Sequence, residues 1–447
     1  MSRPTAAPLQ TPDSSVASIA RRARIASREI AKLSAATRND VLIAVAQAIE
    51  QNARKILEAN ERDCRAAEAE VAAGRLSSAM LARLRVTERG IAQMAAQVRE
   101  VARLEDPLGR RLSTTGLDDG LVLYKESCPF GVIGVIFESR PDAVPQLASL
   151  ALKSGNSILL KGGAEAAHTN EALASIWREC LGKFPEVPAD SINLLQTRAD
   201  VKEMLALDRD VDLIIPRGSY ALVQFIMKNS HIPVLGHSEG LCHVYVDRAA
   251  DLEKAMDIAY DAKVQYPAVC NAAETLLVHE AIAGNFLPRL VAKLKEAKVE
   301  IRGDAKTVAL LPKDAIVPAT EEDWATEYSD LILSVKIVAD LAEAIEHINR
   351  YGSRHTDAIV TEDAETARRF LNEVDAAGVF HNASTRFADG YRYGLGAEVG
   401  ISTSKLHARG PMGLEGLTTY KWKLVGTGHT VGPYARGEKK FKHRRLD

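Results

Sequence analysis

Apolar side chains recur at helical spacing throughout the opening part of the chain. Between residues 13 and 104 they follow steps of three and four residues, as at Val41, Leu42, Val45 and Ile49, while charged residues fill the other positions. This pattern predicts an opening section built only of helices.

The pattern then changes to short apolar runs that alternate with helical stretches. Residues 121–126 and 131–137 read as strands, and the second run is apolar almost throughout, as is typical of a strand covered on both faces. Three further strands, each followed by a helix, are predicted at 157–160, 192–195 and 212–215. A second alternating series has strands at 243–246, 275–278 and 331–338, followed by helices from Leu252, Ala283 and Leu341. Two consecutive α/β domains with parallel sheets are the simplest interpretation.

Glycines crowd the stretch from 382 to 432, which suits loops that approach a ligand or another subunit closely. The basic residues at 436–445 are interpreted as a solvated tail, and residues 1–14 as a mobile one.

Composition places the chain among multidomain globular proteins. Its 447 residues are 46% hydrophobic and 26% charged, and the net charge of -2 gives no basic field for nucleic acid. The longest apolar run, residues 129–137, is far shorter than the roughly 20 residues that cross a bilayer. The five cysteines are scattered and form no C-x-x-C pair, which fits a reducing cytoplasm. A small-molecule substrate is therefore expected, with no nucleic-acid or membrane partner.

Cys270 is the candidate nucleophile among the five cysteines. It stands at the end of a helical stretch, just ahead of an apolar strand, and Asn271 follows it immediately. A backbone N–H and a side-chain amide beside the sulfur are suited to an oxyanion site. The other four cysteines lack such neighbours.

Charged residues end three of the predicted strands, where open α/β sheets bind their ligands. Glu138, Ser139 and Arg140 follow one strand, and the guanidinium there could clamp a carboxylate or phosphate, or form an ordinary surface ion pair. Lys161 ends the next strand before the pair Gly162 and Gly163. Arg217 ends a third strand before Gly218 and Ser219, which open a helix whose free N–H groups attract anions.

Two common site types find no support in the sequence. The G-x-G-x-x-G fingerprint of a standard Rossmann dehydrogenase is absent, because Gly394, Gly396 and Gly400 have the wrong spacing and follow no βαβ strand. The histidines lack the helical pairing of a metalloprotease, so we expect no metal.

Taken together, the separated motifs resemble the gamma-glutamyl phosphate reductase branch of the aldehyde dehydrogenase superfamily, over residues 15–435. The resemblance rests on GVIFESRP at 134–141, LKGG at 160–163, IPRGS at 215–219, GHSEGLCHVYVD at 236–247 and VCNAAETLLVH at 269–279.

The resemblance implies an aldehyde dehydrogenase-like α/β fold. It places an NADPH-binding domain at 15–239, with its N-terminal helices, a catalytic domain at 240–405, and a C-terminal segment at 406–447 that returns to the first domain. A hairpin near 114–127, with the C-terminal segment, would mediate homo-oligomerisation.

Several site roles also follow from the resemblance alone. The superfamily's adenosine-contacting lysine falls on Lys161, its pyrophosphate-contacting helix opening on Gly218 and Ser219, and its ribose-contacting glutamate on Glu327. The usual Phe-Gly-Pro after that glutamate is missing here, so Glu327 is equally a candidate for a solvated loop carboxylate.

Two departures from the oxidising members are informative, and the first of them suits a reductase. His237 takes the place of the glutamate that activates water, although Glu239 lies two residues away and is itself a candidate base. The superfamily's oxyanion asparagine aligns near Arg140, which leaves Asn271 or backbone N–H groups to supply that hydrogen bond.

The activity that the resemblance implies is NADPH-dependent reduction of L-glutamyl 5-phosphate to L-glutamate 5-semialdehyde, through a Cys270 thioester, in proline biosynthesis. Substrate could be handed over by glutamate 5-kinase. Three alternatives remain: an oxidising aldehyde dehydrogenase with Glu239 or Glu327 as base, a cysteine hydrolase or acyltransferase without nucleotide, and a catalytically silent binding protein.

Overall fold

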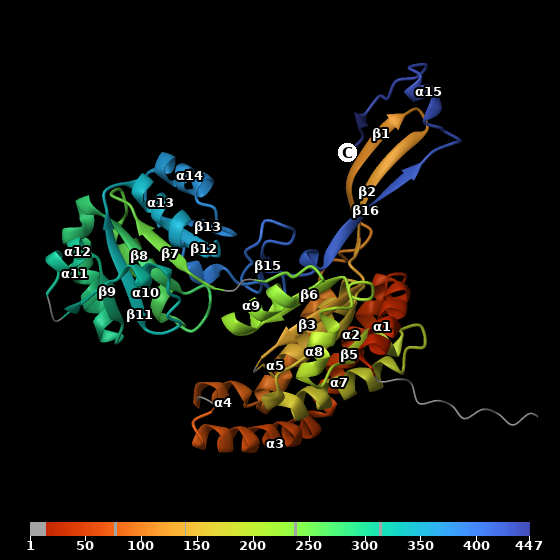
Figure 1. Cartoon of the computed structure of the whole chain (residues 1–447), viewed down its shortest axis with the longest axis horizontal. Coiled ribbons are helices and arrows are strands. Elements are labelled where there is room, and N and C mark those ends of the chain that lie inside the picture. Colours follow the sequence, from red (N-terminus) through yellow and green to blue (C-terminus); the bar gives the residue numbers. More distant parts are fainter. Residues whose placement is uncertain (1–14, 76–77, 139, 237–238, 313–314) are drawn as a thin grey trace, which may run out of the picture. The chain divides into compact units, whose positions relative to one another are not determined.

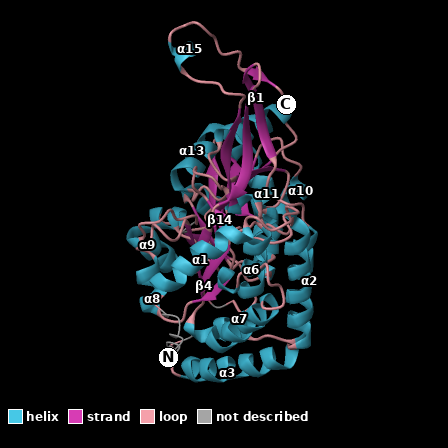
Figure 2. Ribbon diagram, turned by 90° about the vertical axis from the view of Figure 1, so that its right-hand side faces the viewer, coloured by secondary structure: helices cyan, strands magenta, loops and turns pink. Residues whose placement is uncertain are grey.

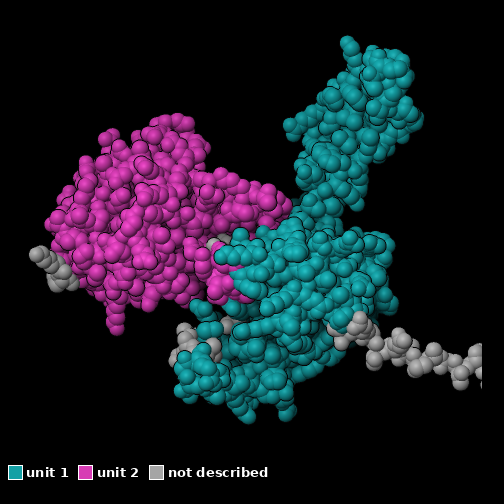
Figure 3. All heavy atoms as spheres, viewed as in Figure 1, with its two compact units in different colours: residues 1–218, 225–234, 417–447 teal, residues 219–224, 235–416 magenta. Residues whose placement is uncertain are grey.

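The computed structural model describes residues 15–75, 78–138, 140–236, 239–312 and 315–447. It divides into two compact units, which are coloured separately in Figure 3. Unit 1 comprises Met1–Gly218, Phe225–Val234 and Leu417–Asp447, and unit 2 comprises Ser219–Gln224 and Leu235–Gly416. The predicted tail at 1–14 lies outside the described residues.

Unit 1 begins with helices, as the apolar spacing predicts. They are α1 (Val16–Ile30), α2 (Ala35–Gln51), α3 (Ala53–Ala72), α4 (Ser78–Leu84) and α5 (Glu88–Arg103). Hydroxyl side chains of Ser15, Ser34 and Thr87 accept backbone N–H groups at the starts of α1, α2 and α5. These caps satisfy donors that the helix itself leaves unpaired, so they fix where the three helices begin.

A four-stranded parallel sheet forms the centre of unit 1. Its order is β5-β4-β3-β6, with β3 (Val132–Phe137), β4 (Ser157–Lys161), β5 (Ile192–Leu194) and β6 (Leu213–Arg217). The associated helices are α6 (Ala143–Lys153), α7 (Ala167–Leu181) and α8 (Arg198–Met204). Helix α9 (Tyr220–Asn229) follows β6, and only its part from Phe225 onward belongs to unit 1. Helices α1, α6 and α7 pack on these strands (Figure 2). The central strand β3 is buried along its whole length, in agreement with its unbroken apolar sequence.

A second sheet of unit 1 is antiparallel and joins distant parts of the chain. Its order is β16-β2-β1-β17, from β1 (Arg111–Asp118), β2 (Leu121–Pro129), β16 (Thr418–Val425) and β17 (Arg444–Arg445). Figure 1 shows the orange hairpin β1–β2 beside the blue strand β16. The hairpin predicted near 114–127 is therefore longer than expected, and the C-terminal segment adds strands on both of its sides.

Unit 2 contains a seven-stranded sheet in which every neighbouring pair is parallel. The order is β10-β9-β11-β8-β7-β12-β13, with β7 (Cys242–Val246), β8 (Ala273–His279), β9 (Glu300–Gly303), β10 (Val317–Pro318), β11 (Ile332–Val338), β12 (Thr356–Val360) and β13 (Gly378–His381). The helices are α10 (Leu252–Val264), α11 (Glu280–Glu296), α12 (Ala305–Leu310), α13 (Leu341–Tyr351) and α14 (Ala364–Glu373). Their apolar faces cover the sheet, with Phe286 and Leu290 fully buried against Leu276 and Val335 in one core cluster.

The glycine-rich stretch contains more regular structure than its composition suggests. It holds the 3₁₀ turn η5 (Thr385–Phe387), the strand pair β14 (Gly400–Ser402) and β15 (Gly410–Met412), and η6 (Glu415–Leu417). Residues 406–416, which we expected in the C-terminal segment, belong to unit 2 because β15 pairs with β14 there. Within the described residues, no helix combines the length and the apolar character that a membrane crossing needs.

Candidate active site

Cys270 lies in the short turn segment that joins α10 to β8. Its side chain is neither fully buried nor fully exposed, and it forms no disulfide. A strand that follows immediately fixes the turn on the sheet, so the thiol sits on a rigid element while reagents can still reach it.

Gly240 approaches the backbone of Cys270 more closely than any residue with a side chain could. A Cβ atom at residue 240 would lie 2.1 Å from the Cys270 carbonyl oxygen and 2.4 Å from its Cα. Glycine is therefore required here by a backbone contact, which the sequence motif alone did not reveal.

Asn271 ties the nucleophile's turn to the turn η5. Its side-chain Nδ2 donates to the carbonyl of Ala388 at 2.8 Å, and its own carbonyl accepts from Thr385 Oγ1 at 2.7 Å. The side chain is buried, and among the described residues its Oδ1 has no hydrogen-bond partner. One of the two hydrogens of the Asn271 amide is therefore used in a structural bond. The backbone N–H groups of Cys270 and Asn271 have no partner in the described part of the chain, so they are further candidates for oxyanion donors.

Arg386 is a buried cation of the same site that the sequence reasoning missed. Its Nε donates to Gln265 Oε1 at 2.9 Å, and the residue is only 7% exposed. Burial lowers the pKa of Arg386, and the nearby charge of Arg392 lowers it further, while Asp261, Asp389 and Cys270 raise it. No periodicity marks this arginine, because it lies in a loop distant in sequence from Cys270.

Cys242 lies behind the nucleophile and is sealed from solvent. Its Sγ donates to the Cys270 carbonyl at 3.3 Å and lies 3.7 Å from His355 Nδ1. Burial raises the pKa of the Cys242 thiol well above its usual range, so this cysteine stays an unreactive thiol.

A buried ion pair joins the end of α10 to the start of β8. Lys263 Nζ donates to Glu274 Oε2 at 2.6 Å, and both side chains are almost completely buried. Burial raises the pKa of Glu274 to about 7 despite the opposing charge of Lys263.

The two glutamates proposed from the sequence lie near each other in unit 2. Burial, and then the charge of Glu327, raise the pKa of Glu239, and the charge of Glu327 also raises that of Glu274. Glu327 is half-buried. His237, the residue in the place of the hydrolytic base, lies outside the described residues.

In unit 1 the structure brings together the three strand ends singled out in the sequence. Phe137 pairs with Arg217 across β3 and β6, Ile136 pairs with Lys161 across β3 and β4, and Glu138 N donates to the Arg217 carbonyl at 3.1 Å. The carboxyl ends of three neighbouring parallel strands therefore meet at one edge, where such sheets bind ligands.

Lys161 and the glycines after it are tightly packed. The ammonium of Lys161 donates to the Gly162 carbonyl, and burial lowers its pKa, against the charges of Glu165 and Asp200. A Cβ atom at Gly162 would lie 2.2 Å from Asn170 Nδ2, and one at Gly163 would lie 2.0 Å from Glu165 Oε1.

The remaining predicted residues sit around the same edge or beside it in sequence. Arg217 Nη1 donates to Gln146 Oε1 at 3.1 Å, and Ser219 immediately precedes α9, where its carbonyl accepts from Val223 N. Arg140 is exposed and its guanidinium pairs with no described residue, whereas Ser139 lies outside the described residues. Gly218 and Ser219 fall on the border between the two units.

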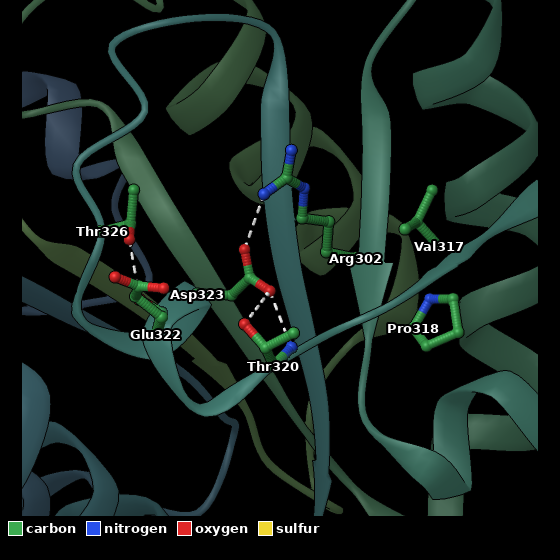
Figure 4. A pocket seen from close by; sticks show the side chains of 7 residues that line it. All are labelled: Arg302, Val317, Pro318, Thr320, Glu322, Asp323 and Thr326. Atoms are coloured by element: carbon green, nitrogen blue, oxygen red, sulfur yellow. Dashed lines mark hydrogen bonds and ion pairs between the residues drawn. The ribbon is translucent and has the colours of Figure 1, made fainter.

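A cavity of unit 2 lies next in sequence to Glu327, and Cys270 is not part of its lining. It has a volume of about 290 Å³ and is lined by Arg302, Val317, Pro318, Thr320, Glu322, Asp323 and Thr326 (Figure 4). Its principal charges are already paired, because Arg302 Nη1 lies 2.7 Å from Asp323 Oδ1. A second cavity of about 220 Å³ in unit 1 is bounded by the start of α5 and by Pro141 and Asp142, next in sequence to Arg140. No group of three or more metal-binding side chains occurs in the part of the chain that the structure describes.

Comparison with known proteins agrees with the predicted family and fold. The aldehyde dehydrogenase family matches residues 5–311. A gamma-glutamyl phosphate reductase of Synechococcus sp. (strain JA-2-3B'a(2-13)) is 56% identical over 423 residues, 94% of this chain and 92% of that protein. One from Natronomonas pharaonis is 54% identical and covers 95% of this chain and 96% of its own. The crystal structure of gamma-glutamyl phosphate reductase from Thermotoga maritima superposes with a TM-score of 0.89 at 41% identity, over 93% of this chain and 100% of that one. The family and the α/β aldehyde dehydrogenase-like fold predicted from the motifs are thus confirmed, and the chain belongs to the gamma-glutamyl phosphate reductases of the aldehyde dehydrogenase family.

Proposed function

We propose that this chain reduces L-glutamyl 5-phosphate to L-glutamate 5-semialdehyde and phosphate, the glutamate-5-semialdehyde dehydrogenase step of proline biosynthesis. The observation that carries the proposal is the accessible Cys270 thiol on a turn held by Gly240, Asn271 and η5, in a chain of this family. The family implies a nicotinamide cofactor, and we propose NADPH.

The Cys270 sulfur attacks the acyl carbon of the substrate. A carbon–sulfur bond forms, the bond from the carbon to the bridging phosphate oxygen breaks, and phosphate leaves with the electron pair. The enzyme then carries the acyl group as a thioester, which divides one difficult reduction into two easier steps. Backbone N–H groups of Cys270 and Asn271 stabilise the negative charge that develops on the carbonyl oxygen. Reduction of the thioester carbon and loss of the thiolate yield the aldehyde.

The edge formed by β3, β4 and β6 is where we propose that the cofactor binds. When bound there, NADPH supplies the hydride. Lys161 offers a cation at the end of β4, and its only described hydrogen bond is to the neighbouring carbonyl of Gly162, so the donor set fits a ribose or a 2′-phosphate. The neighbouring strand ends and the start of α9 favour an anion, and we propose that their residues contact the cofactor phosphates. These residues are Gly162, Gly163, Arg217, Gly218 and Ser219. Glu327 is proposed as a ribose contact.

Arg140, Ser139 and Glu138 are proposed to contact the substrate because they follow the central strand β3. The exposed guanidinium of Arg140 is available for a carboxylate or phosphate.

A hydrolytic aldehyde dehydrogenase is the one competing function that an observation favours. Burial raises the pKa of Glu239, and a carboxylate of raised pKa is a stronger base toward water. That enzyme would release free glutamate from the same Cys270 thioester.

Reverse turnover separates these two functions. NADP⁺ reduction by L-glutamate 5-semialdehyde is measured with and without inorganic phosphate, and with NAD⁺ in parallel. Turnover that requires phosphate supports the reductase, because phosphate must take the acyl group from the thioester. Steady turnover without phosphate that is lost in Glu239→Gln would contradict it, and a preference for NAD⁺ would contradict the choice of NADPH.

We also propose a cytoplasmic homo-oligomer that receives its labile substrate from a glutamate 5-kinase. The antiparallel sheet of unit 1 carries exposed apolar side chains at Trp422, Leu424 and Val425, which a second copy would cover. Sedimentation of the wild type and of Trp422→Glu tests this, and a monomeric wild type would contradict it.

A further inference from the structure

The turn η5 (Thr385–Phe387) holds Arg386 in a fixed place relative to the nucleophile's turn. Two hydrogen bonds join the segments on either side of this arginine: Thr385 Oγ1 donates to the Asn271 carbonyl at 2.7 Å, and Asn271 Nδ2 donates to the Ala388 carbonyl at 2.8 Å. Because Asn271 follows Cys270 directly, any movement of η5 would also disturb the nucleophile. The backbone of Arg386 is thus held at a fixed position relative to Cys270.

The guanidinium of Arg386 is only partly used by the protein. Its Nε donates to Gln265 Oε1 at 2.9 Å. Its terminal nitrogens, Nη1 and Nη2, have no hydrogen-bond partner among the described residues, yet neither is fully sealed from solvent. A buried guanidinium that leaves its two-pronged end open is suited to bidentate binding of an oxyanion.

The charges around Arg386 indicate which kind of anion fits. Arg392 adds a second cation, and its guanidinium donates to the Arg386 carbonyl. Asp261 and Asp389 lie near enough to offset part of this positive charge, and Cys270 is also close enough to interact electrostatically with Arg386. The site therefore combines two cations with the reactive sulfur.

We propose that Arg386 binds the phosphoryl group of the substrate beside Cys270. This inference rests on the proposed function. In an acyl phosphate the phosphorus is separated by one oxygen from the carbon that Cys270 attacks, whereas the α-carboxylate of a glutamyl substrate lies at the far end of the carbon chain. Arg386 lies on a turn that is hydrogen-bonded to Asn271, the residue after Cys270, so it is placed for the phosphate rather than for the carboxylate.

The role of Arg386 is the same in both directions of the reaction. In the forward direction the carbon–oxygen bond to phosphate breaks, and Nη1 and Nη2 donate to the oxygens that gain charge. In reverse a phosphate oxygen attacks the thioester carbon, the carbon–sulfur bond breaks, and the thiolate of Cys270 leaves. Arg386 aligns that phosphate oxygen with the thioester carbon.

The test uses L-glutamate 5-semialdehyde, NADP⁺ and inorganic phosphate with the full-length wild type and Arg386→Gln. We expect the KM for phosphate to rise about 10- to 100-fold, the value of one to two lost charge-assisted hydrogen bonds. The burst of NADPH formed in a single turnover without phosphate reports acylation of Cys270 alone, and we expect it to stay within about twofold of the wild type, because phosphate takes no part in that step. Arg386→Lys, which keeps the charge but loses the fork, should give an intermediate KM.

Arg350→Gln is the matched control. This exposed arginine of unit 2 pairs with Glu321 and is not among the charged neighbours of Arg386, so its loss should leave the KM for phosphate unchanged. If Arg386→Gln fails to fold, the test uses Arg386→Lys and Gln265→Ala instead. Gln265→Ala removes the hydrogen-bond acceptor of Arg386 Nε, and both variants should raise the KM for phosphate.

Two results would overturn the inference while leaving the proposed function in place. One is an unchanged KM for phosphate in a folded Arg386 variant. The other is a lost burst, or a raised KM for the semialdehyde, in a variant whose affinity for phosphate is intact. That second result would mean that Arg386 contacts the carboxylate or stabilises the fold. A wild type that turns over without any need for phosphate would instead contradict the proposed function, and the inference with it.

Discussion

Replacing Gly240 with alanine would place a methyl group against the backbone of the nucleophile. The added Cβ would lie 2.1 Å from the Cys270 carbonyl oxygen, 2.4 Å from its Cα and 2.5 Å from its Cβ, whereas ordinary contacts begin near 3.4 Å. None of these atoms is the end of a flexible side chain. Relief of the clash therefore requires the turn that carries Cys270, or the segment around residue 240, to shift by about 1.3 Å, the difference between 3.4 and 2.1 Å.

A shift of this size is expected to affect catalysis more than stability. Overpacking a filled site costs about 1–3 kcal/mol of folding free energy. Misplacement of a reacting group by about 1 Å costs on the order of 100-fold in rate. We therefore expect Gly240→Ala to fold with a thermal midpoint lowered by a few degrees, and to lose about two orders of magnitude in kcat.

Gly284→Ala provides a matched control with the opposite sign. Gly284 lies within α11 (Glu280–Glu296), and a Cβ there would meet nothing within 4 Å. Alanine in place of glycine inside a helix gains about 0.5–1 kcal/mol, so this variant should be slightly more stable and fully active. The assays are phosphate-dependent NADP⁺ reduction, the rate of Cys270 alkylation, and thermal unfolding. Wild-type kcat and alkylation rate in Gly240→Ala would refute the reasoning.

Three further predictions follow from the buried groups of unit 2. Burial, then neighbouring charges, lower the pKa of His347 from 6.5 to about 2, so the folded state does not take up the proton that the unfolded chain binds below pH 6.5. This contribution to stability is present at pH 7 and is lost as pH falls. Between pH 7 and pH 5 the free energy of unfolding, measured in urea, should fall by about 2 kcal/mol more for the wild type than for His347→Gln. An equal fall in the two proteins would contradict this. Lys263→Met should cost about 3–5 kcal/mol because it leaves the Glu274 carboxylate buried without its partner, and adding Glu274→Leu should restore most of that loss; a double variant no more stable than the single one would count against a buried ion pair. Iodoacetamide should label Cys270 but not Cys242 in the folded protein, as read by peptide mass mapping, and labelling of Cys242 would contradict its burial.

The sequence predicted those parts of the fold that produce strong local patterns. Helical apolar spacing located the opening helices, and apolar runs located β3, β4, β6, β7 and β8. It did not locate β9, β12 or β13, which are short strands within segments of mixed polarity, so their identity depends on pairing with neighbours rather than on local periodicity. The pairing of β16 with β2 joins residues about 300 positions apart, and only the implied family architecture suggested it.

The candidate site divides in the same way. Cys270 was singled out because it precedes an apolar strand and is followed by Asn271, whereas Lys161 and Arg217 were singled out because they end apolar strands. Arg386 was missed, since its relation to Cys270 arises from hydrogen bonds between two loops more than 100 residues apart. The oxyanion role proposed for Asn271 was suggested by adjacency in sequence, and the structure adds that one hydrogen of its Nδ2 is used in a bond to the Ala388 carbonyl.

The central claim is that Cys270 carries the acyl group as a thioester. Mass spectrometry of the enzyme incubated with L-glutamate 5-semialdehyde and NADP⁺, in the absence of phosphate, tests it most directly. We expect a glutamyl adduct that maps to the peptide containing Cys270, disappears on addition of phosphate, and is absent from Cys270→Ser. An adduct on another residue, or phosphate-dependent turnover by Cys270→Ser at the wild-type rate, would contradict the account.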